Sequence, residues 1–517
     1  MTSEQLPMRP EQGPERQLRD LASAFGLEEP SQDVALSGVS LSSREVRPGD
    51  LFAALHGLKV HGATFAADAV HAGAAAMLTD SAGAGLCADL GVPVLVAADP
   101  RAILGAVSAW IYGNPAERIT VVGVTGTNGK TTTSYFVQAA LSAVHPVTAV
   151  LGTVELRIGD QAVESPRTTV EAPVLHGLLA VMRERGATAC SMEVSSHALA
   201  LHRVDGLVFD VVGFTNLSRD HLDFHGDMAG YYRDKSRLFA AGQAKRGVVC
   251  VDDEWGVRLA AEATIPVVTV ATRDDGVGRA DADWVVGDAT IGLDGVGSAF
   301  TLRGPGVEVA AHSPLPGVVN VSNAALAIVM SVEAGVPLAA AVEAIAVAHE
   351  IPGRMERVIE RGGGFPLCIV DYAHTPDALV LALEAVRPIT PGRLILVFGS
   401  DGDRDRGKRP MMGEIAARYA DVLVVTDENP RSEPAERIRA EILAGVRSVR
   451  PDGRDVHEAT VSRAQAIRDA LDLATERDTI LVTGKGHEPT QEIAGVFHRY
   501  NDRDVFLAAR AGRKAAE

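Results

Sequence analysis

Short apolar runs alternate with helical stretches along most of this chain, and most of these runs end in polar residues. The clearest run, residues 119–124, predicts a buried strand, and the segment from Lys130 to Leu141 has helical character. Similar runs alternate with helical segments further on, in a Rossmann-like order, at residues 368–372, 394–398, 422–426 and 479–483. This alternation predicts an α/β protein with mainly parallel sheets.

Turn-forming residues mark the end of a first predicted domain. Residues 41–44 and 47–54 predict a strand, a turn and a second strand, and a helix is expected at 103–112. Because Gly113-Asn-Pro115 should stop that helix, we expect a small α/β N-terminal domain over residues 1–113.

Two further domains are expected downstream. The central domain should span residues 114–350 and contain a mainly parallel sheet, with the Gly- and Asp-rich segment 274–307 as an antiparallel excursion or loop. The sequence Pro352-Gly-Arg354 opens a C-terminal, Rossmann-like domain over residues 351–517. A chain of 517 residues is too long for one core, which agrees with about three domains.

Charge and composition limit the classes of function. The formal net charge of −18 argues against nucleic acid as a partner, because binding a phosphate backbone requires a basic face. The polar N-terminal segment does not resemble a secretory signal, and no apolar run approaches the roughly 20 residues that span a bilayer. We therefore expect a cytoplasmic protein with no membrane partner. The four cysteines are far apart, which fits buried thiols better than disulfides or zinc.

A glycine-rich segment, Gly123-Val-Thr-Gly-Thr-Asn-Gly-Lys-Thr-Thr-Thr133, lies between the first predicted strand and helix. A loop at a helix N-terminus binds phosphate oxygens through free N–H groups and the positive end of the helix dipole. Lys130 would reach the terminal phosphates of a nucleotide, and Thr131 would hold Mg2+. The strict pattern G-x-x-x-x-G-K-[ST] requires glycine at position 124, which is valine here, so this is a variant phosphate loop.

Two more polar segments follow apolar strands in the central domain. Glu193 lies in Met192-Glu-Val-Ser-Ser-His197, and His221 lies in a polar stretch after a strand predicted at 208–214. A carboxylate and an imidazole together suit Mg2+ or Mn2+ better than a zinc cage. Next to a phosphate loop, these residues predict a metal-dependent nucleotide site.

Nine motifs together resemble a single family. In chain order they are TGTNGKTTT, MEVSSHALALHR, NLSRDHLDFHG, YYRDKSRLF, GRMERV, DYAHTPDAL, GDRDRGKRP, DENPR and GKGHE. The set looks like the Mur ligases of peptidoglycan synthesis, and most nearly those that add the third amino acid of the peptide. The resemblance implies a UDP-binding N-terminal domain, a central ATPase domain and a C-terminal domain for the incoming amino acid.

The resemblance also implies a reaction. The substrates would be ATP, UDP-N-acetylmuramoyl-L-alanyl-D-glutamate and a diamino acid, with Mg2+ as cofactor, and we expect the protein to act as a monomer. The γ-phosphoryl group would pass to the free carboxylate of the D-glutamate residue, and the amine of the third amino acid would then displace phosphate. Lys130, Mg2+ and Arg354 would neutralise the charges gathered for this in-line transfer.

The family's binding positions carry over onto matching residues of this sequence. Those for ATP are Gly126, Thr127, Asn128, Gly129, Lys130, Thr131, Thr132, Arg354 and Asp371. Those for the UDP-muramoyl peptide are Leu41 and Ser43 at the uridine and Thr168, Thr169, Ser195 and Arg203 at the peptide. Arg167 departs from the pattern, because asparagine commonly precedes the threonine pair, and Leu201 replaces a glutamine of some relatives.

The resemblance assigns a special role to Lys235, which matches the lysine that this family carbamylates. As N6-carboxylysine it would be an anionic oxygen ligand at the metal, beside Thr131, Glu193 and His221. The catalytic set would then be Lys130, Glu193, His221 and Lys235.

The residues expected to bind the third amino acid are Arg404, Glu428, Asn429, Pro430, Arg431, Gly484 and Glu488. The family's diaminopimelate signature D-N-P-R reads Glu428-Asn-Pro-Arg431 here. Arg431 and Arg404 offer forked donors to a distal carboxylate, which lysine and ornithine lack, and Glu488 would accept from an ammonium group. The sequence favours meso-2,6-diaminopimelate, with L-lysine or L-ornithine as the alternative because Glu428 replaces aspartate.

Two other classes of protein fit part of the sequence. A folylpolyglutamate synthetase-like ligase shares the variant loop and the acyl-phosphate chemistry, but such enzymes place the loop much nearer the N-terminus. A P-loop switch or binding module without ligase activity would leave Glu193, His221 and Lys235 without a purpose. A ligase should hydrolyse ATP only when a carboxylate substrate and an amine are both present, whereas such a module should hydrolyse ATP alone.

Overall fold

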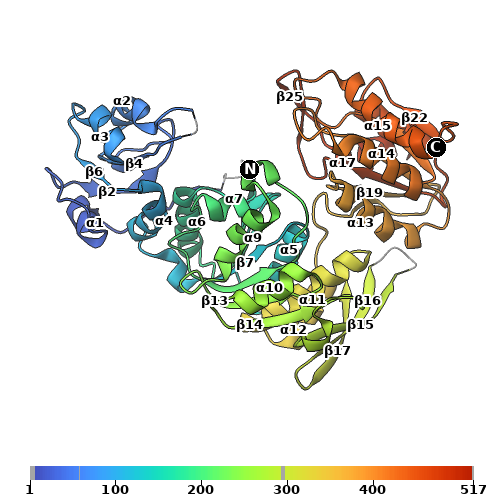
Figure 1. Cartoon of the computed structure of the whole chain (residues 1–517), viewed down its shortest axis with the longest axis horizontal. Coiled ribbons are helices and arrows are strands. Elements are labelled where there is room, and N and C mark those ends of the chain that lie inside the picture. The colour runs from blue at the N-terminus through green and yellow to red at the C-terminus, as the bar shows by residue number, and fades with distance from the viewer. Residues whose placement is uncertain (1–5, 58, 293–296, 515–517) are drawn as a thin grey trace. The chain divides into compact units, whose positions relative to one another are not determined.

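The computed structural model describes residues 6–57, 59–292 and 297–514 (Figure 1). The chain divides into two compact units, one made of Met1–Val285 and Leu326–Ala344 and the other of Val286–Ala325 and Ile345–Glu517. Strands and helices alternate through both units, which confirms the predicted α/β class. Among the described residues, no helix is long and apolar enough to cross a membrane.

A four-stranded parallel sheet, blue in Figure 1, forms the N-terminal part of the first unit. Its strands lie in the order β3 (Gly38–Ser40), β4 (Asp50–Ala54), β5 (Ala76–Thr79) and β6 (Val94–Val96). The neighbouring helices are α1 (Leu18–Ala24), α2 (Ala66–His71), α3 (Ser81–Cys87) and α4 (Pro100–Ile111), and β1 (Arg16–Gln17) pairs with β2 (Ala35–Leu36). Leu51 and Leu78 of the sheet share one apolar core with Leu104 of α4.

The strand expected over residues 41–44 is wrong, because this segment forms a turn. The Ser40 hydroxyl donates to the Ser42 carbonyl oxygen at 3.0 Å and accepts from the Ser42 amide at 3.2 Å. These local bonds replace the bonds of a sheet ladder and end β3 at Ser40. Leu41 and Ser43, the expected uridine contacts, therefore lie in the turn that follows β3.

The larger sheet of the first unit is mainly parallel, as predicted. Neighbouring parallel strands follow the order β8 (Thr148–Leu151), β11 (Ala189–Glu193), β7 (Thr120–Thr125), β12 (Phe209–Phe214), β13 (Ala244–Cys250) and β14 (Val267–Ala271). The antiparallel strands β9 (Glu155–Ile158) and β10 (Gln161–Glu164) extend it beyond β8. Its helices are α5 (Lys130–Leu141), α6 (Ala172–Glu184), α7 (Ser196–Ala200), α8 (Leu222–His225), α9 (Met228–Ser236) and α10 (Glu254–Glu262).

Strand β7 lies between β11 and β12, and its last five residues are buried. Because both faces of a parallel sheet are covered, the strand is an apolar run and not an alternating one. A Cβ added at Gly123 would lie only 2.7 Å from a ring carbon of Phe209 on β12, so close packing requires glycine here. The upstream glycine of the variant motif therefore serves the packing of the sheet.

The antiparallel excursion or loop expected over residues 274–307 is wrong for its first strand, because β15 (Trp284–Ile291) pairs in parallel with β14 and continues the parallel part of the sheet. The antiparallel pair β16 (Ser298–Gly304) and β17 (Val307–Ser313) follows. The helices α11 (Val318–Glu333) and α12 (Leu338–Ala346) follow.

The C-terminal part of the second unit contains one sheet, whose strands confirm the four runs predicted there. Its order is β18 (Glu356–Ile359), β19 (Leu367–Asp371), β23 (Thr479–Thr483), β20 (Leu394–Phe398), β21 (Val422–Val425) and β22 (Val456–Glu458), and all pairs except β18–β19 are parallel. Its helices are α13 (Pro376–Val386), α14 (Lys408–Tyr419), α15 (Ala435–Val449), α16 (Arg463–Leu473) and α17 (Asp502–Lys514). A short hairpin, β24 (Thr490–Ile493) and β25 (Val496–Arg499), follows β23.

Candidate active site

The predicted phosphate loop connects β7 to α5. Gly126 has a φ angle of 146°, and a Cβ there would lie 1.8 Å from the Thr215 hydroxyl oxygen. Two residues after β12 hold the loop from the side. The Thr215 hydroxyl donates to the Asn128 carbonyl oxygen at 2.6 Å, and the Asn216 carbonyl oxygen accepts from the Thr127 amide at 2.9 Å. The neighbouring strand therefore fixes the shape of the loop.

Two lysines converge on this loop. The Lys130 ammonium group donates to the carbonyl oxygens of Gly126 at 3.0 Å and Thr127 at 2.8 Å. Lys235, from α9, is almost fully buried and donates to the same Gly126 oxygen at 2.8 Å. Burial lowers the pKa of Lys235 well below its usual value, and the positive charge of Lys130 lowers it further. The structure thus places a lysine known only from the family resemblance beside the lysine of the loop.

Glu193, at the end of β11, faces the start of α5. Its Oε2 accepts from the Thr131 hydroxyl at 3.0 Å, and its Oε1 accepts from the Thr153 amide at 2.7 Å. The carboxylate is buried, and a Cβ at position 152 would lie 2.3 Å from Oε1, so Gly152 leaves room for it. Hard oxygen donors of this kind suit Mg2+, and the Thr131–Glu193 pair fits such an ion.

His221 lies close to the same group of residues. It has a left-handed backbone with a φ angle of 51°, and its ring centroid is 4.8 Å from that of His197. Burial lowers the pKa of His221, Asp220 opposes this, and the charges of Lys130 and Lys235 lower it further. His221 is therefore within electrostatic range of both lysines.

Within the described residues, no three His, Cys, Asp or Glu side chains gather so as to hold a metal ion by themselves. The predicted metal set contains only two side chains of those kinds, Glu193 and His221. It depends on the Thr131 hydroxyl and on the modification of Lys235 for its remaining ligands.

A buried histidine links two of the segments in this site. His225 Nδ1 is 2.8 Å from Asp234 Oδ2, and its Nε2 is 2.9 Å from the Ser196 hydroxyl. Asp234 precedes Lys235 on α9, and Ser196 follows Ser195. The hydrogen bonds of His225 therefore tie the helix of the buried lysine to the expected peptide-binding turn.

The residues expected to contact the muramoyl peptide lie together next to Glu193. The Thr169 hydroxyl donates to the Glu193 carbonyl oxygen at 2.9 Å and accepts from the Ser195 amide at 3.0 Å. Arg203 donates to the Thr169 carbonyl oxygen at 3.4 Å, and the Thr168 hydroxyl accepts from Thr153 at 3.1 Å.

Sequence reasoning missed an arginine cluster around Glu171. Guanidinium nitrogens of Arg203, Arg167 and Arg101 lie 2.8, 2.9 and 3.5 Å from its carboxylate oxygens. Arg101 lies on α4, whereas Arg167 lies between β10 and α6 and Arg203 lies between α7 and β12. Three guanidinium groups around one carboxylate leave an excess of positive charge next to Thr169. The sequence had singled out Arg203, as an expected peptide contact, and Arg167, as a departure from the family pattern, but it gave no reason to place Arg101 or Glu171 beside them.

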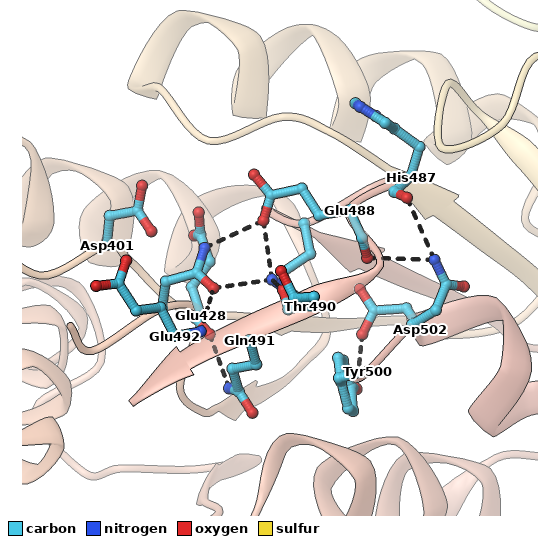
Figure 2. Close-up of polar contacts among 12 residues, drawn as sticks. Asp401, Glu428, His487, Glu488, Thr490, Gln491, Glu492, Tyr500 and Asp502 are labelled. Atoms are coloured by element: carbon cyan, nitrogen blue, oxygen red, sulfur yellow. Dashed lines mark hydrogen bonds and ion pairs between the residues drawn. The ribbon is translucent and has the colours of Figure 1, made fainter. Parts of the chain in front are cut away.

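In the second unit, Asn429 and Glu488 share a buried lysine that sequence reasoning did not assign. Lys485 Nζ donates to Asn429 Oδ1 at 2.9 Å and to Glu488 Oε2 at 2.8 Å, and Asn429 Nδ2 donates to the same Glu488 oxygen at 3.1 Å (Figure 2). The motif GKGHE contained Lys485, but its spacing gave no reason to single it out.

The expected recognition motif after β21 is bonded to the hairpin that follows β23. The Arg431 amide donates to the Glu492 carbonyl oxygen at 3.1 Å, and the Arg431 carbonyl oxygen accepts from the Ala494 amide at 2.7 Å. Gln491 donates to the Glu428 carbonyl oxygen at 2.7 Å. Pro430 sits between these anchored residues, and Arg431 has a φ angle of 55°. The hairpin therefore fixes the direction in which the Arg431 side chain leaves the backbone.

Glu428, the residue that departs from the signature, is buried beneath Gly484. A Cβ at position 484 would lie 2.5 Å from Glu428 Oε2. Burial, reinforced by the negative charge of Asp401, raises the pKa of Glu428 to about 8. Arg404, in contrast, is exposed in the loop after β20.

The two residues expected to reach ATP from this unit are both neighbours of Tyr372. Asp371 accepts from the Met355 amide and the Ala373 amide, both at 2.8 Å. The Arg354 guanidinium lies 4.4 Å from the centroid of the Tyr372 ring. Asp371 thus orders the turn that follows Arg354.

The fold and site define a class: an α/β enzyme with a variant phosphate loop, a Thr–Glu pair fit for Mg2+ and, in the second unit, a separate polar motif at the carboxyl ends of parallel strands. The chain matches the Mur ligase family, catalytic domain, over residues 35–110, the Mur ligase middle domain over 124–331 and the Mur ligase glutamate ligase domain over 353–486.

Similarity to known proteins extends over nearly the whole chain. This chain is 47% identical over 504 residues to the UDP-N-acetylmuramoyl-L-alanyl-D-glutamate–2,6-diaminopimelate ligase of Streptomyces avermitilis. The alignment covers 97% of this chain and 98% of that one. A solved structure of a ligase with the same name is 33% identical, with a TM-score of 0.65 over 93% of this chain and 96% of that one. The chain belongs to the Mur ligase family, as the motifs predicted.

The folylpolyglutamate alternative shares the fold over a smaller part of the chain. The Mycobacterium tuberculosis folylpolyglutamate synthase complexed with ADP is 21% identical, with a TM-score of 0.58 over 75% of this chain and 92% of that one. This likeness concerns the fold alone. The much higher identity to a Mur ligase, together with the match at residues 35–110, favours the Mur ligase interpretation, and family membership argues against a non-ligase module.

Proposed function

We propose that this chain is an ATP-dependent ligase that joins meso-2,6-diaminopimelate to UDP-N-acetylmuramoyl-L-alanyl-D-glutamate in peptidoglycan precursor synthesis. The observation that carries this proposal is its 47% identity, over nearly the whole chain, to a ligase of that name. The proposed domains are residues 1–113 for the UDP moiety, 114–350 for ATP and 351–517 for the amino acid.

ATP would bind through the phosphate loop, Gly126 to Thr132. The loop amides and Lys130 hold the phosphate oxygens, which requires the Lys130 ammonium group to leave the two backbone carbonyls that it now contacts. A carboxylate oxygen of the D-glutamate residue then attacks the γ-phosphorus as ADP leaves. The amine of the third amino acid attacks the resulting acyl carbon, inorganic phosphate leaves, and the amine loses a proton. Arg354 and Asp371 would contact ATP from the C-terminal domain.

Mg2+ would be held by Thr131, Glu193, His221 and carbamylated Lys235, and it would supply positive charge to the phosphate oxygens. Modification of Lys235 is favoured by its environment. Burial lowers the pKa of Lys235, which favours the neutral amine, and a neutral amine adds to carbon dioxide with release of one proton. The product is an anion, which relieves the repulsion between two neighbouring cations.

The UDP-muramoyl peptide would lie along Leu41 and Ser43 at one end and Thr168, Thr169, Ser195 and Arg203 at the other. The third amino acid would occupy the motif formed by Glu428, Asn429, Pro430 and Arg431 with Gly484, Glu488 and Arg404. Arg431 would bind a distal carboxylate, which favours meso-2,6-diaminopimelate over L-lysine and L-ornithine.

We also propose that the protein acts as a cytoplasmic monomer. Its four cysteines are buried thiols, as expected in a reducing compartment.

The proposed function is tested by phosphate release with ATP, UDP-N-acetylmuramoyl-L-alanyl-D-glutamate and one of meso-diaminopimelate, L-lysine or L-ornithine. We expect release with meso-diaminopimelate, and none when either the carboxylate substrate or the amine is omitted. Release with L-lysine or L-ornithine but not meso-diaminopimelate would contradict the proposed amino acid. Equal release with ATP alone would contradict ligation.

A further inference from the structure

Three polar atoms in the amino-acid motif are buried without a hydrogen-bond partner in the described part of the chain. They are Oδ1 of Asp401, Oε2 of Glu428 and Nε of Arg431. Buried polar atoms are nearly always paired, so three unpaired atoms in one motif require an explanation. Two of them need a hydrogen-bond donor and one needs an acceptor, and a zwitterion offers both.

The three residues come from adjacent strand ends. Asp401 follows β20, and Glu428 and Arg431 follow β21, which pairs with β20 in parallel. Asp401 Oδ2 lies 3.5 Å from the Arg431 guanidinium, and Asp401 is the charged group that acts most strongly on Glu428. The labelled side chains of Asp401, Glu428 and Glu492 gather at one end of the cluster in Figure 2. Ligands of open α/β sheets bind at such carboxyl ends of strands.

The carboxyl group of Glu428 is buried, and its Oε2 has no hydrogen-bond partner in the described part of the chain. Glu428 is 3% exposed, and glycine at position 484 is required to leave room for its Oε2. Its raised pKa agrees with a carboxyl group that keeps a proton while no cation is present. A ligand ammonium group would supply the missing hydrogen bond and favour the charged carboxylate.

Glu488, the acid expected from the family resemblance to receive an ammonium group, is already engaged. Its Oε2 accepts from both Lys485 and Asn429, and the charge of Lys485 offsets its own. A substrate ammonium group in this motif therefore needs further negative charge, and Asp401 and Glu428 supply it.

We propose that Asp401 and Glu428 together form the subsite for the distal ammonium group of the incoming diamino acid, while Arg431 Nε receives its distal carboxylate. This inference rests on the proposed ligase function. It makes Asp401, which no motif had singled out, a specificity-determining residue. Glu428 and Arg431 were already expected from the family resemblance to bind the third amino acid, so the new element is the second carboxylate that Asp401 supplies.

The test compares two substrates that differ only at the proposed contact. Meso-2,6-diaminopimelate carries the distal ammonium group, and L-2-aminopimelate has the same carbon chain and distal carboxylate without it. We expect the wild-type enzyme to prefer diaminopimelate by about 100-fold or more in kcat/KM, because a site built for a polar group rejects the analogue that lacks it. Asp401→Asn and Glu428→Gln should each reduce that preference by about 10-fold or more.

A ratio of two substrates on the same enzyme sample is insensitive to partial unfolding. Glu436→Gln, which removes an exposed carboxylate at the start of α15, serves as the matched control and should leave the ratio unchanged. Glu428→Asp keeps the charge and should keep the preference within about 3-fold of the wild type.

An unchanged ratio in both Asp401→Asn and Glu428→Gln overturns the subsite, whatever happens to the overall rate. A Glu428→Asp variant that loses as much preference as Glu428→Gln also overturns it, because the carboxylate would then not be the determinant. A wild-type enzyme that ligates no diamino acid would instead contradict the proposed function.

Discussion

Lys130 and Lys235 donate hydrogen bonds to the same acceptor, the Gly126 carbonyl oxygen, at 3.0 and 2.8 Å. Two ammonium groups on one oxygen repel each other, and of the two lysines Lys235 is the more buried. Burial and the neighbouring charge of Lys130 therefore both lower the pKa of Lys235. A lowered pKa at this position favours the proposed carbamate.

Replacement of Lys235 tests the proposed carbamate. We expect Lys235→Ala to lower kcat by about 100-fold or more with little change in the KM for ATP, because a metal ligand is lost while the phosphate loop remains. Phosphate release in the complete reaction provides the measurement, and mass spectrometry of the native protein should find one added carboxyl group on Lys235. Lys245→Ala, at an exposed lysine of β13, is the control. Full activity in Lys235→Ala would exclude the modified lysine from catalysis.

Two glycines three positions apart should respond differently to alanine. Gly126→Ala places a Cβ 1.8 Å from the Thr215 oxygen at a φ angle of 146°, so we expect it to abolish nucleotide binding. Gly123→Ala crowds Phe209 and should lower the free energy of unfolding by about 1–3 kcal/mol, while the Kd of the folded protein for ATP is preserved. Calorimetric titration and urea unfolding measure these effects. Gly85→Ala, which meets no atom within 4 Å, should change neither.

Glu428 should make stability depend on pH. Its pKa is raised from 4.5 to about 8 in the folded protein, so the folded state binds a proton that the unfolded chain releases between these values. This contribution to stability is complete below pH 4.5 and is lost as the pH rises through 8. Between about pH 5 and pH 8, the Tm of the wild type should fall more steeply than that of Glu428→Gln. Parallel Tm curves for the two proteins would show that Glu428 titrates normally.

A fully buried ion pair connects α16 and α17 in the second unit. Arg463 donates to both carboxylate oxygens of Asp502 at 2.8 Å, and both side chains are inaccessible to solvent. Asp502→Ala leaves a buried guanidinium without its counterion, and we expect it to lower the free energy of unfolding by about 3–5 kcal/mol. Urea unfolding provides the measurement. Glu414→Ala, which removes a partly exposed partner of Arg418 on α14, should leave the unfolding midpoint nearly unchanged. If both variants lose the same free energy of unfolding, burial of the Arg463–Asp502 pair does not explain the loss.

The arginine cluster around Glu171 should contribute to binding of the UDP-muramoyl peptide. We expect Arg167→Ala and Arg101→Ala to raise the KM for this substrate by about 3- to 10-fold each, and Glu171→Gln to lower it, because Glu171 competes for the same guanidinium groups. The KM for ATP should not change. If all three variants change the KM for ATP and the KM for the UDP-muramoyl peptide by the same factor, the cluster stabilises the fold and does not bind this substrate.

The sequence predicted the parts of the molecule whose pattern is local. Strand β20 coincides with the predicted run at 394–398, and helix α5 with Lys130–Leu141, because a buried parallel strand and a helix after a glycine turn each leave a short, characteristic pattern. The segment 41–44 was misassigned because the bonds between Ser40 and Ser42 end the strand earlier, and such side-chain bonds have no periodic signal.

What the sequence did not predict depends on contacts between distant residues. Lys485 lies 56 positions from Asn429, and Arg101 lies 70 positions from Glu171. No spacing rule connects such pairs. Asp401 was overlooked for a different reason, since an aspartate in a polar loop is ordinary until its oxygen is found buried without a partner.

Hydrogen bonds from Gln491, Glu492 and Ala494 to Glu428, Asn429 and Arg431 mean that the proposed amino-acid recognition depends on two chain segments at once. Transplanting the four-residue motif into another ligase would leave its backbone without the support of hairpin β24–β25. Attempts to redesign this enzyme for a different amino acid should therefore exchange the motif, Lys485 and the hairpin as one cassette.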